Sequence, residues 1–364
     1  MVRYMKTRFT NKQKIALWGL IKYPAFNDRE TSDKIKMKLS TLTTIRYRML
    51  DECVYKMVNV PVVNRMAFEM AAVFIIRLAS ASNNKDLGFK KDEFPNLVYI
   101  AHDQNRILAL GFYPDYTLAV SDLNDLAAKL RKSKLIARSG HWMKYIPLGN
   151  YEVPNYFDES IFVNQGLELN RPEAITSKGS IFKGDAIHLS SFERKVLNEL
   201  VAFPEETDVQ LSKNLKITRS TVARIRSRLL GLAYKTLNIV DLAKLGYKAI
   251  SIAAPDYSMT YDEGKGAIVK AASNLGYPIF FAVSDNSCVF MTAHKELRGI
   301  RNRTNNAFKG GAFKGHIQDP SHIATFNLRT LKVLRNHDYV NLTRQVLELY
   351  YYKPKKRKKA NVGQ

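Results

Sequence analysis

Residues 36–50 read KMKLSTLTTIRYRML, and residues 216–230 read KITRSTVARIRSRLL. The two stretches align without a gap at a constant offset, since Ser40 matches Ser220 (220 − 40 = 180) and Arg46 matches Arg226. An internal repeat indicates that one structural unit occurs twice in the chain. In both copies apolar residues recur at helical spacing beside Ser, Thr and Arg, which predicts an amphipathic helix with a polar outer face.

The sequence before each of these helices predicts two more helices, and the sequence after it predicts a short β wing. Pro24 and Pro204 stop the first helix of each copy. The expected helices are 15–23, 29–36 and 39–52 in the first copy, and 192–203, 208–215 and 219–230 in the second. The expected wings consist of residues 59–60 with 66–68, and of residues 238–239 with 245–247.

Each helical unit is followed by sequence that predicts a βαββαβ unit, the ferredoxin-like plan. In the second copy we expect strands at 249–254, 279–283, 288–292 and 323–328, with helices near 264–275 and 295–308. In the first copy we expect strands at 71–78, 97–101, 106–112 and 141–147, a helix at 121–132 and a degenerate first helix within 80–93.

The predicted fold class is therefore α+β, with two tandem copies of a winged helix-turn-helix followed by a ferredoxin-like domain. The expected boundaries are 1–66 for the first winged helix, 67–149 for the degenerate first ferredoxin-like domain, 150–188 for the connection between copies, 189–246 for the second winged helix, 247–352 for the second ferredoxin-like domain with a C-terminal helix at 341–352, and 353–364 for a basic disordered tail.

The charge of the chain indicates a polyanionic partner. The 57 Lys and Arg residues outnumber the 33 Asp and Glu residues and give a net charge of +24. Such an excess is typical of proteins that bind nucleic acid, and less often of proteins that bind anionic membranes. We expect the tail to add affinity for nucleic acid without sequence preference. Its basic residues assigned to this contact are Lys355, Lys356, Arg357, Lys358 and Lys359.

The remaining composition favours a cytoplasmic, nucleoid-associated protein. The two cysteines, Cys53 and Cys288, are not repeat counterparts and show no zinc-site spacing, as expected in a reducing compartment. The sequence after Met1 has no secretory pattern, and the apolar stretch 71–78 is too short to span a bilayer. We therefore expect no membrane partner and no structural metal.

A recognition helix packs one face on its own domain and places the other in the major groove. Arginine is the usual bidentate reader of guanine, and Ser and Thr contact phosphates or several bases. Copy two is the more basic of the two helices, and copy one is richer in hydroxyl groups. The predicted DNA contacts are Ser40, Thr43, Thr44, Arg46, Tyr47 and Arg48 in copy one, and Arg219, Ser220, Thr221, Arg224, Arg226, Ser227 and Arg228 in copy two.

The segment from Ser220 to Leu229 resembles the recognition helix of Lrp/AsnC-type (feast/famine) transcription regulators, of the archaeal type. This resemblance implies a winged helix joined to a ferredoxin-like domain that dimerises and often binds a small ligand. The chain resembles two such subunits fused in tandem over nearly its whole length. It has no clear match to the glycine-bearing effector loop of the family, so the resemblance assigns no effector residues and leaves a small-molecule effector open.

The tandem resemblance implies double-stranded DNA as the partner, bound by two non-identical heads. The second copy is tethered to the first, so we expect an intrachain pseudo-dimer, with further homodimerisation left open. We expect no catalytic residues and no cofactor. Two alternatives remain: a tetrapyrrole enzyme like siroheme decarboxylases, which resemble the same architecture, and a nucleoid-associated architectural protein with weak sequence preference.

Overall fold

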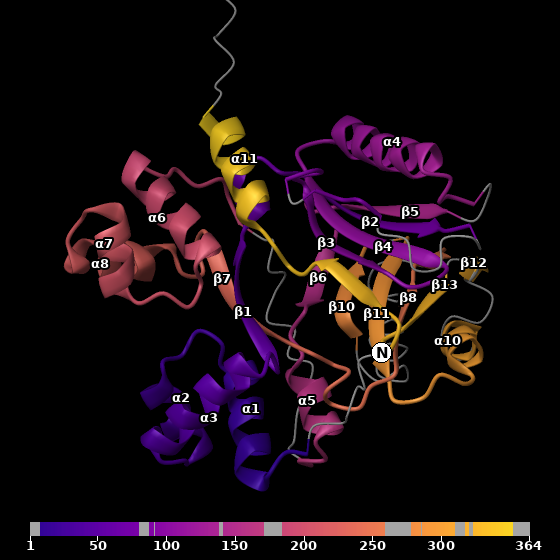
Figure 1. Ribbon diagram of the computed structural model, residues 1–364. Coiled ribbons are helices and arrows are strands. Elements are labelled where there is room, and N and C mark those ends of the chain that lie inside the picture. Colours follow the sequence, from indigo (N-terminus) through magenta and orange to yellow (C-terminus); the bar gives the residue numbers. More distant parts are fainter. Residues whose placement is uncertain are drawn as a thin grey trace, which may run out of the picture.

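The computed structural model describes residues 8–79, 87–90, 92–137, 141–170, 184–258, 278–284, 286–309, 317–319 and 323–351. These residues form an α+β fold, as the sequence predicts, with helices and antiparallel sheets. Figure 1 shows two groups of helices on one side of the molecule and the large sheets on the other, with strands β1 (Tyr55–Pro61) and β7 (Tyr234–Val240) running between them.

We call the two groups of helices head 1 and head 2. Head 1 consists of α1 (Asn11–Lys22), α2 (Asp28–Ile35) and α3 (Leu39–Asp51). Head 2 consists of α6 (Ser191–Ala202), α7 (Asp208–Leu215) and α8 (Arg219–Leu229). All six helices lie within two residues of their predicted ends, except that α1 begins four residues earlier than predicted.

The helix ends follow from local signals that recur at the offset of 180. Capping boxes, in which a side chain at the cap and one three residues later satisfy each other's backbone N–H, begin four helices. The pairs are Thr10 with Gln13, Ser190 with Glu193, Asn27 with Glu30, and Thr207 with Gln210. Lys36 and Lys216 then end α2 and α7 in the left-handed conformation, with φ of 56° and 54°.

Strands β1 and β7 form a two-stranded antiparallel ribbon between the copies. The predicted wing within each copy is wrong, because Val63–Met66 forms the 3₁₀ helix η1 and residues 242–246 form turns. The strands that contain the expected wing residues 59–60 and 238–239 pair with each other instead. Val58 lies opposite Leu237, which is its repeat counterpart (237 − 58 = 179). A pseudo-two-fold axis therefore passes through the middle of the ribbon.

Each copy contributes four strands to a five-stranded sheet. In sheet 1 the order is β14-β3-β4-β2-β5, and in sheet 2 it is β13-β8-β11-β10-β6. The first-copy elements are β2 (Met70–Arg77), β3 (Leu97–His102), β4 (Arg106–Tyr113), α4 (Tyr116–Lys132) and β5 (Trp142–Pro147). The second-copy elements are β8 (Ala249–Ala253), β10 (Pro278–Val283), β11 (Cys288–His294), α10 (Ile300–Lys309) and β13 (Ile323–Asn327), with the short pair β9 (Asp256–Tyr257) and β12 (Ile317–Asp319).

Two predicted helices have a different outcome. The helix expected near 264–275 lies outside the described residues, as do residues 80–86 of the degenerate helix in copy one. The described residues 87–90, 92 and 93 are not helical.

The fifth strand of each sheet comes from the other copy. Strand β6 (Glu152–Tyr156) pairs with β10, and β14 (Lys332–Arg335) pairs with β3. The registers are equivalent, since Glu152 lies opposite Val283 and Lys332 lies opposite His102. This reciprocal exchange places β6 and α5 (Ser160–Gly166) inside the stretch 150–188 that was expected to be a connection. Their counterparts are β14 and α11 (Val340–Tyr351).

The main core is continuous through both copies. It contains the inner faces of both heads, the ribbon and the facing sides of the two sheets, for example Val98 and Leu110 with Ile250 and Met291. A second core lies between the other face of sheet 1 and helix α4. Helix α5 packs on α1, and α11 packs on α6 at the matching place in the other copy.

Candidate functional site

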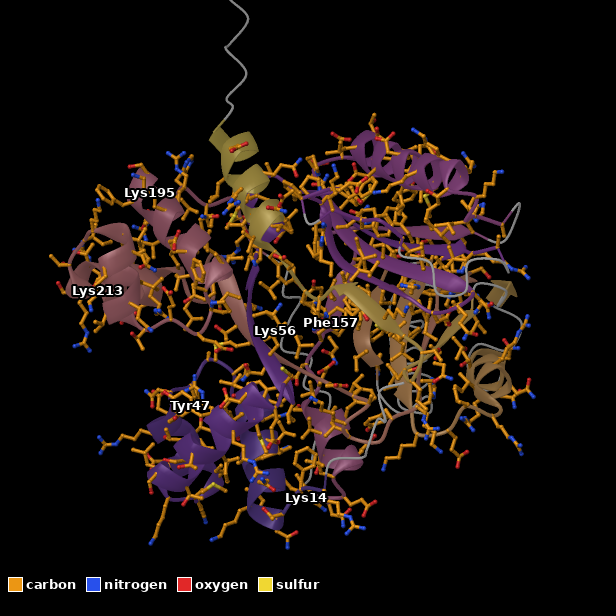
Figure 2. All side chains as sticks on the ribbon, in the orientation of Figure 1. Lys14, Tyr47, Lys56, Phe157, Lys195 and Lys213 are labelled. Atoms are coloured by element: carbon orange, nitrogen blue, oxygen red, sulfur yellow. The ribbon has the colours of Figure 1, made fainter. Side chains whose placement is uncertain are left out.

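Helices α3 and α8 present matching outer faces. Leu42 and Val222 are both buried, as are Met49 and Leu229, and exposed positions recur at the same offset. The exposed pairs are Leu39 with Arg219, Ser40 with Ser220, Thr44 with Arg224, Tyr47 with Ser227, and Arg48 with Arg228. Figure 2 shows Tyr47 on the surface of head 1 and Lys213 on the surface of head 2.

Several of the predicted DNA contacts are held within the heads. Arg46 forms an ion pair with Asp28 at 2.7 Å, and its counterpart Arg226 forms one with Asp208 at 2.7 Å. Thr43 also donates to Asp28, over 2.8 Å. These side chains tie the third helix of each head to the second.

Other predicted contacts are paired at the surface. Arg228 pairs with the buried Glu193 at 2.5 Å, and Arg48 pairs with Glu52 at 2.8 Å. Thr221 lies at the N-terminus of α8, where its backbone N–H bonds Thr218. Within the described chain, Arg219 and Arg224 are exposed and form no ion pair with an acidic side chain. The basic tail lies outside the described residues.

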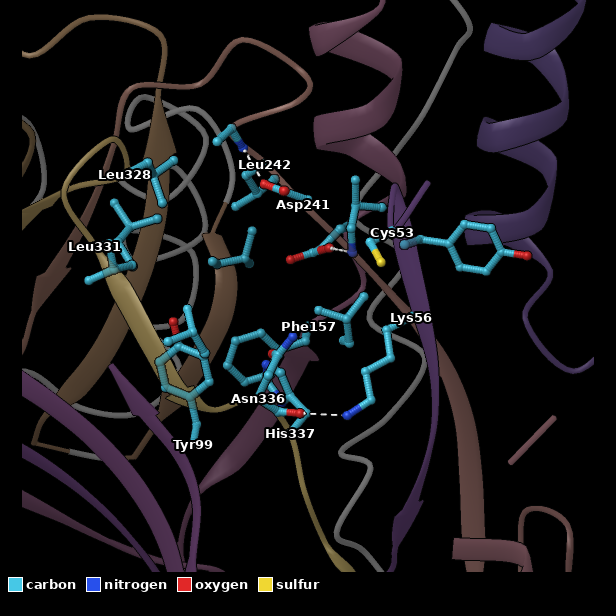
Figure 3. Close-up of a pocket in the computed structure, with 18 of the residues that line it drawn as sticks. Cys53, Lys56, Tyr99, Phe157, Asp241, Leu242, Leu328, Leu331, Asn336 and His337 are labelled. Carbon is cyan, nitrogen blue, oxygen red and sulfur yellow. Dashed lines mark hydrogen bonds between the residues drawn. The ribbon is translucent and has the colours of Figure 1, made fainter. Parts of the chain in front are cut away.

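A cavity of about 600 Å³ lies between head 1, the ribbon and the facing sides of the sheets. Its mouth carries the exposed residues Asp51, Cys53 and Lys56 from head 1 and β1, with Glu205 from head 2. Figure 3 shows Tyr99, Phe157 and His337 grouped at one end, and the ammonium of Lys56 donating to the Asn336 carbonyl. This hydrogen bond is 2.9 Å long.

The repeat relates this cavity to an equivalent position in the other copy, and the residues at the two positions differ. Glu159 and Asn336 line it, and their counterparts Tyr339 and Tyr156 are buried with their hydroxyls 2.6 Å apart. Asp241 likewise corresponds to the buried Val62. Two aromatic side chains and a valine thus fill one place, whereas smaller and polar side chains leave room at the other.

Two titratable groups at the bottom of the cavity are strongly shifted. Glu159 is 2% exposed, and this burial raises its pKa to about 8, although the Val240 N–H donates to its Oε2 over 2.5 Å. His337 is 3% exposed and stacks edge-on against Phe157, with ring centroids 4.2 Å apart. Burial lowers the pKa of His337 to about 3, and the nearby Lys56 charge adds to the shift.

Sequence reasoning missed Phe157, Glu159, Asn336 and His337, because the first two lie in the stretch assigned to the connection and the other two directly follow the last hairpin. A signal was available: the offset of 180 continues through residues 152–166 and 332–346, where it aligns Glu159 with Tyr339 and Phe157 with His337. When a carboxylate in one copy aligns with a tyrosine in the other, the two positions have different roles.

The described part of the chain holds no cluster of three metal-ligating side chains, and none of its helices is long and apolar enough to cross a membrane. One further buried polar cluster lies on sheet 2. There Ser251 Oγ is 2.7 Å and Thr292 Oγ1 is 3.0 Å from His294 Nε2. These three side chains hydrogen-bond to one another on the face of sheet 2 that carries α10, away from the cavity.

Comparison with known proteins gives one kind of match. No protein-family model matches the chain, and no curated protein matches it. Two solved structures are similar, one of the siroheme decarboxylase NirDL and one of the same enzyme in complex with an iron-uroporphyrin III analogue. Their TM-scores are 0.48 and 0.49, with 9% sequence identity, covering 93% of this chain and 99% of theirs. Both are structures of the enzyme class named above as an alternative.

Proposed function

We propose that the chain binds double-stranded DNA through two non-identical helix-turn-helix heads and acts as a transcription regulator in the manner of the Lrp/AsnC type. The observation that carries this proposal is the matching exposure of α3 and α8 at the offset of 180. In each head the same arginine is bound to the second helix, which leaves the N-terminal half of the outer face for a ligand. On α8 that half carries Arg219 and Arg224, on a chain of net charge +24.

The two heads have different roles in this proposal. Arg219 and Arg224 provide guanidinium groups that read guanine, with Ser220 and Ser227 beside them. Their counterparts Leu39 and Thr44, beside Ser40 and the 62% exposed Tyr47, make weaker and less specific contacts. The pseudo-two-fold axis through the ribbon relates the heads, so one chain acts as its own dimer. Because operator symmetry mirrors protein symmetry, the preferred site is asymmetric, with its better-defined half under head 2.

The first prediction compares counterpart residues. Replacing Arg219 or Arg224 with Ala is expected to weaken binding to a selected duplex by about 1–3 kcal/mol each, because a bidentate base contact is lost. Replacing Leu39 or Thr44 with Ala is the matched control and costs less. Fluorescence anisotropy on selected and random duplexes measures both effects. Equal losses of affinity on the two duplexes would show that these arginines contact only phosphates. A wild-type chain that binds neither duplex would contradict the proposal.

The tail allows a second prediction. Residues 353–359 hold six basic side chains, which release counterions wherever they meet phosphate. Deleting residues 353–364 is expected to lower the slope of log affinity against log salt by up to about 5, at roughly 0.9 for each phosphate contact. The ratio of specific to random binding should stay the same. An unchanged slope would show that the tail does not contact DNA.

The enzymatic alternative makes a different demand on the cavity. Uroporphyrin-type tetrapyrroles carry several carboxylates, so a site for one needs cations. Among the described residues that line the cavity, one side chain, Lys56, carries an ammonium group. Four carry carboxyl groups: Asp51, Glu159, Glu205 and Asp241. This balance counts against a uroporphyrin-type ligand in this cavity. Purified protein that shows a Soret band, or gains one when it is mixed with an iron-uroporphyrin, would favour the enzymatic alternative.

A further inference from the structure

The cavity contains a carboxyl group that is buried and has few hydrogen-bond partners. Within the described chain, the hydrogen bond that reaches the Glu159 carboxyl is the one from the Val240 N–H, and no ion pair reaches it. A carboxylate accepts about four hydrogen bonds, and an uncompensated buried charge costs several kcal/mol. The equivalent place in the other copy holds Tyr339, a residue that avoids this cost. Without a ligand Glu159 therefore avoids this cost by staying mostly protonated at pH 7, and a bound cation would let it ionise.

We propose that this cavity binds an organic ammonium ion with an aromatic body, whose charge is held by Glu159 and Asp241. Both carboxyl groups line the same cavity, and repulsion from Asp241, which lies 3.9 Å from the Lys244 ammonium, disfavours the ionised form of Glu159. An ammonium group supplies three N–H donors and removes this repulsion. A metal ion fits less well, since the described residues offer no group of three ligands here.

The walls of the cavity select the rest of the ligand. Tyr99 and Phe157 provide aromatic surfaces, and Leu242, Ile279 and Met291 provide aliphatic ones. Aromatic faces attract cations and pack against rings at the same time. About 600 Å³ is within the range of sites for drug-sized ligands. A primary amine attached to one or two rings has both the charge and the apolar body that this lining demands.

Binding should release a proton. The pKa of Glu159 is about 8, so at pH 7 its carboxyl is mostly protonated, and an ammonium ion favours the ionised form. Up to one proton leaves per ligand bound, and affinity rises as the pH rises from 7 towards 8. The other charged or titratable groups that face the cavity, together with the neighbouring Asp158, are Asp51, Cys53, Tyr55, Lys56, Tyr99, Glu205, Asp241 and His337.

Titration calorimetry on the full-length chain tests this proposal, with tyramine and tryptamine as probes. The controls are 4-ethylphenol, which lacks the amine, and 3-(4-hydroxyphenyl)propionate, which carries the opposite charge. We expect the amines to bind and both controls to bind at least about tenfold more weakly. Repeating the titration in phosphate and Tris buffers, whose ionisation enthalpies differ, counts the released protons. The experiment contains no DNA, so its outcome is independent of the proposed function.

Two variants separate the role of Glu159 from its effect on folding. Glu159→Gln keeps the acceptor for the Val240 N–H, and is expected to weaken amine binding about ten- to hundredfold and to abolish proton release. The double variant E159Y/N336Y copies the Tyr339–Tyr156 pair, fills the cavity and should lose binding while remaining folded. The proposal is overturned if neither amine binds, if the propionate binds as tightly as tyramine, or if Glu159→Gln binds amines like the wild type.

Discussion

Replacing Arg335 with Met is expected to lower the free energy of unfolding by about 3–5 kcal/mol, because a buried charge-bearing donor is removed from its partners. Arg335 lies on β14, comes from the second copy, and is 9% exposed. Its guanidinium donates to the carbonyls of Glu93 at 2.8 Å, Phe94 at 2.7 Å and Leu97 at 2.5 Å, all in the first copy. A methionine fills similar space but leaves these carbonyls without their donor.

The counterpart of Arg335 provides the control. Asn155 on β6 donates to the Pro278 carbonyl at 2.7 Å across the other exchanged edge. Asn155→Ala removes this bond and two local ones, in which Asn155 donates to the Asp158 carbonyl and accepts from the Asp158 N–H. All three are neutral and lie in a less buried place, so the variant should cost only about 1–2 kcal/mol. Urea denaturation followed by the fluorescence of Trp18 in head 1 and Trp142 in sheet 1 measures both variants. A smaller loss for R335M than for N155A would show that Arg335 does not secure the exchange.

The sequence predicted well those features that depend on local signals. Helices of both heads follow from apolar spacing and from capping pairs such as Thr10 with Gln13, which are visible in the chain itself. The strands of the two sheets follow from buried runs such as residues 71–78, whose strand is Met70–Arg77. Each of these elements is determined by residues within a few positions of one another, so one sequence is enough to place it.

The partners of the strands could not be predicted in the same way. Strand β1 has the same pattern whether it pairs with residues 66–68 of its own copy or with β7 of the other, and only the complete fold selects β7. The exchange of β6 and β14 could not be predicted for the same reason, because both are short edge strands whose sequences do not identify their partners. Arg46 and Arg226 were likewise expected to contact DNA, and their spacing does not reveal the carboxylates of Asp28 and Asp208 beside them.

The candidate cavity depends on these pairings. Glu159 and Asp241 are far apart in the sequence, and they line one cavity because the copies interlock. The repeat alignment could have singled out Glu159 through its counterpart Tyr339. It could not have shown that the carboxyl is buried, since burial depends on β7 and on both sheets.

His337→Phe is expected to make the protein more resistant to acid. His337 has a pKa of about 3 in the folded chain, below the usual value of 6.5. Above pH 6.5 the imidazole is neutral in both states and contributes no pH dependence. As the pH falls below 6.5, the unfolded chain takes up a proton that the folded chain refuses, so the folded state loses about 1.4 kcal/mol per pH unit. Phenylalanine removes this loss.

The repeat indicates that phenylalanine fits, because the counterpart Phe157 packs against this same ring. The hydrogen bond between Tyr156 and Tyr339 also remains available to support the site. The difference in unfolding free energy between H337F and the wild type should therefore be constant above pH 7. At pH 4.5 it should have shifted in favour of the variant by about 2–3 kcal/mol relative to that constant value. His294 and Glu159, which also have shifted pKa values, are present in both proteins and cancel in this difference.

Denaturant titrations at half-unit steps from pH 4.5 to 8 measure this difference. The exposed His141 supplies the control, and His141→Gln is expected to follow the wild-type profile throughout. Parallel profiles for H337F and the wild type would mean that His337 takes up its proton equally well in both states. In that case solvent reaches the bottom of the cavity and Glu159 is hydrated too, because Glu159 and His337 line the same cavity. A divergence that begins near pH 6.5 would instead show that this end of the cavity is dry, the condition under which an ammonium ion gains most from a buried carboxylate.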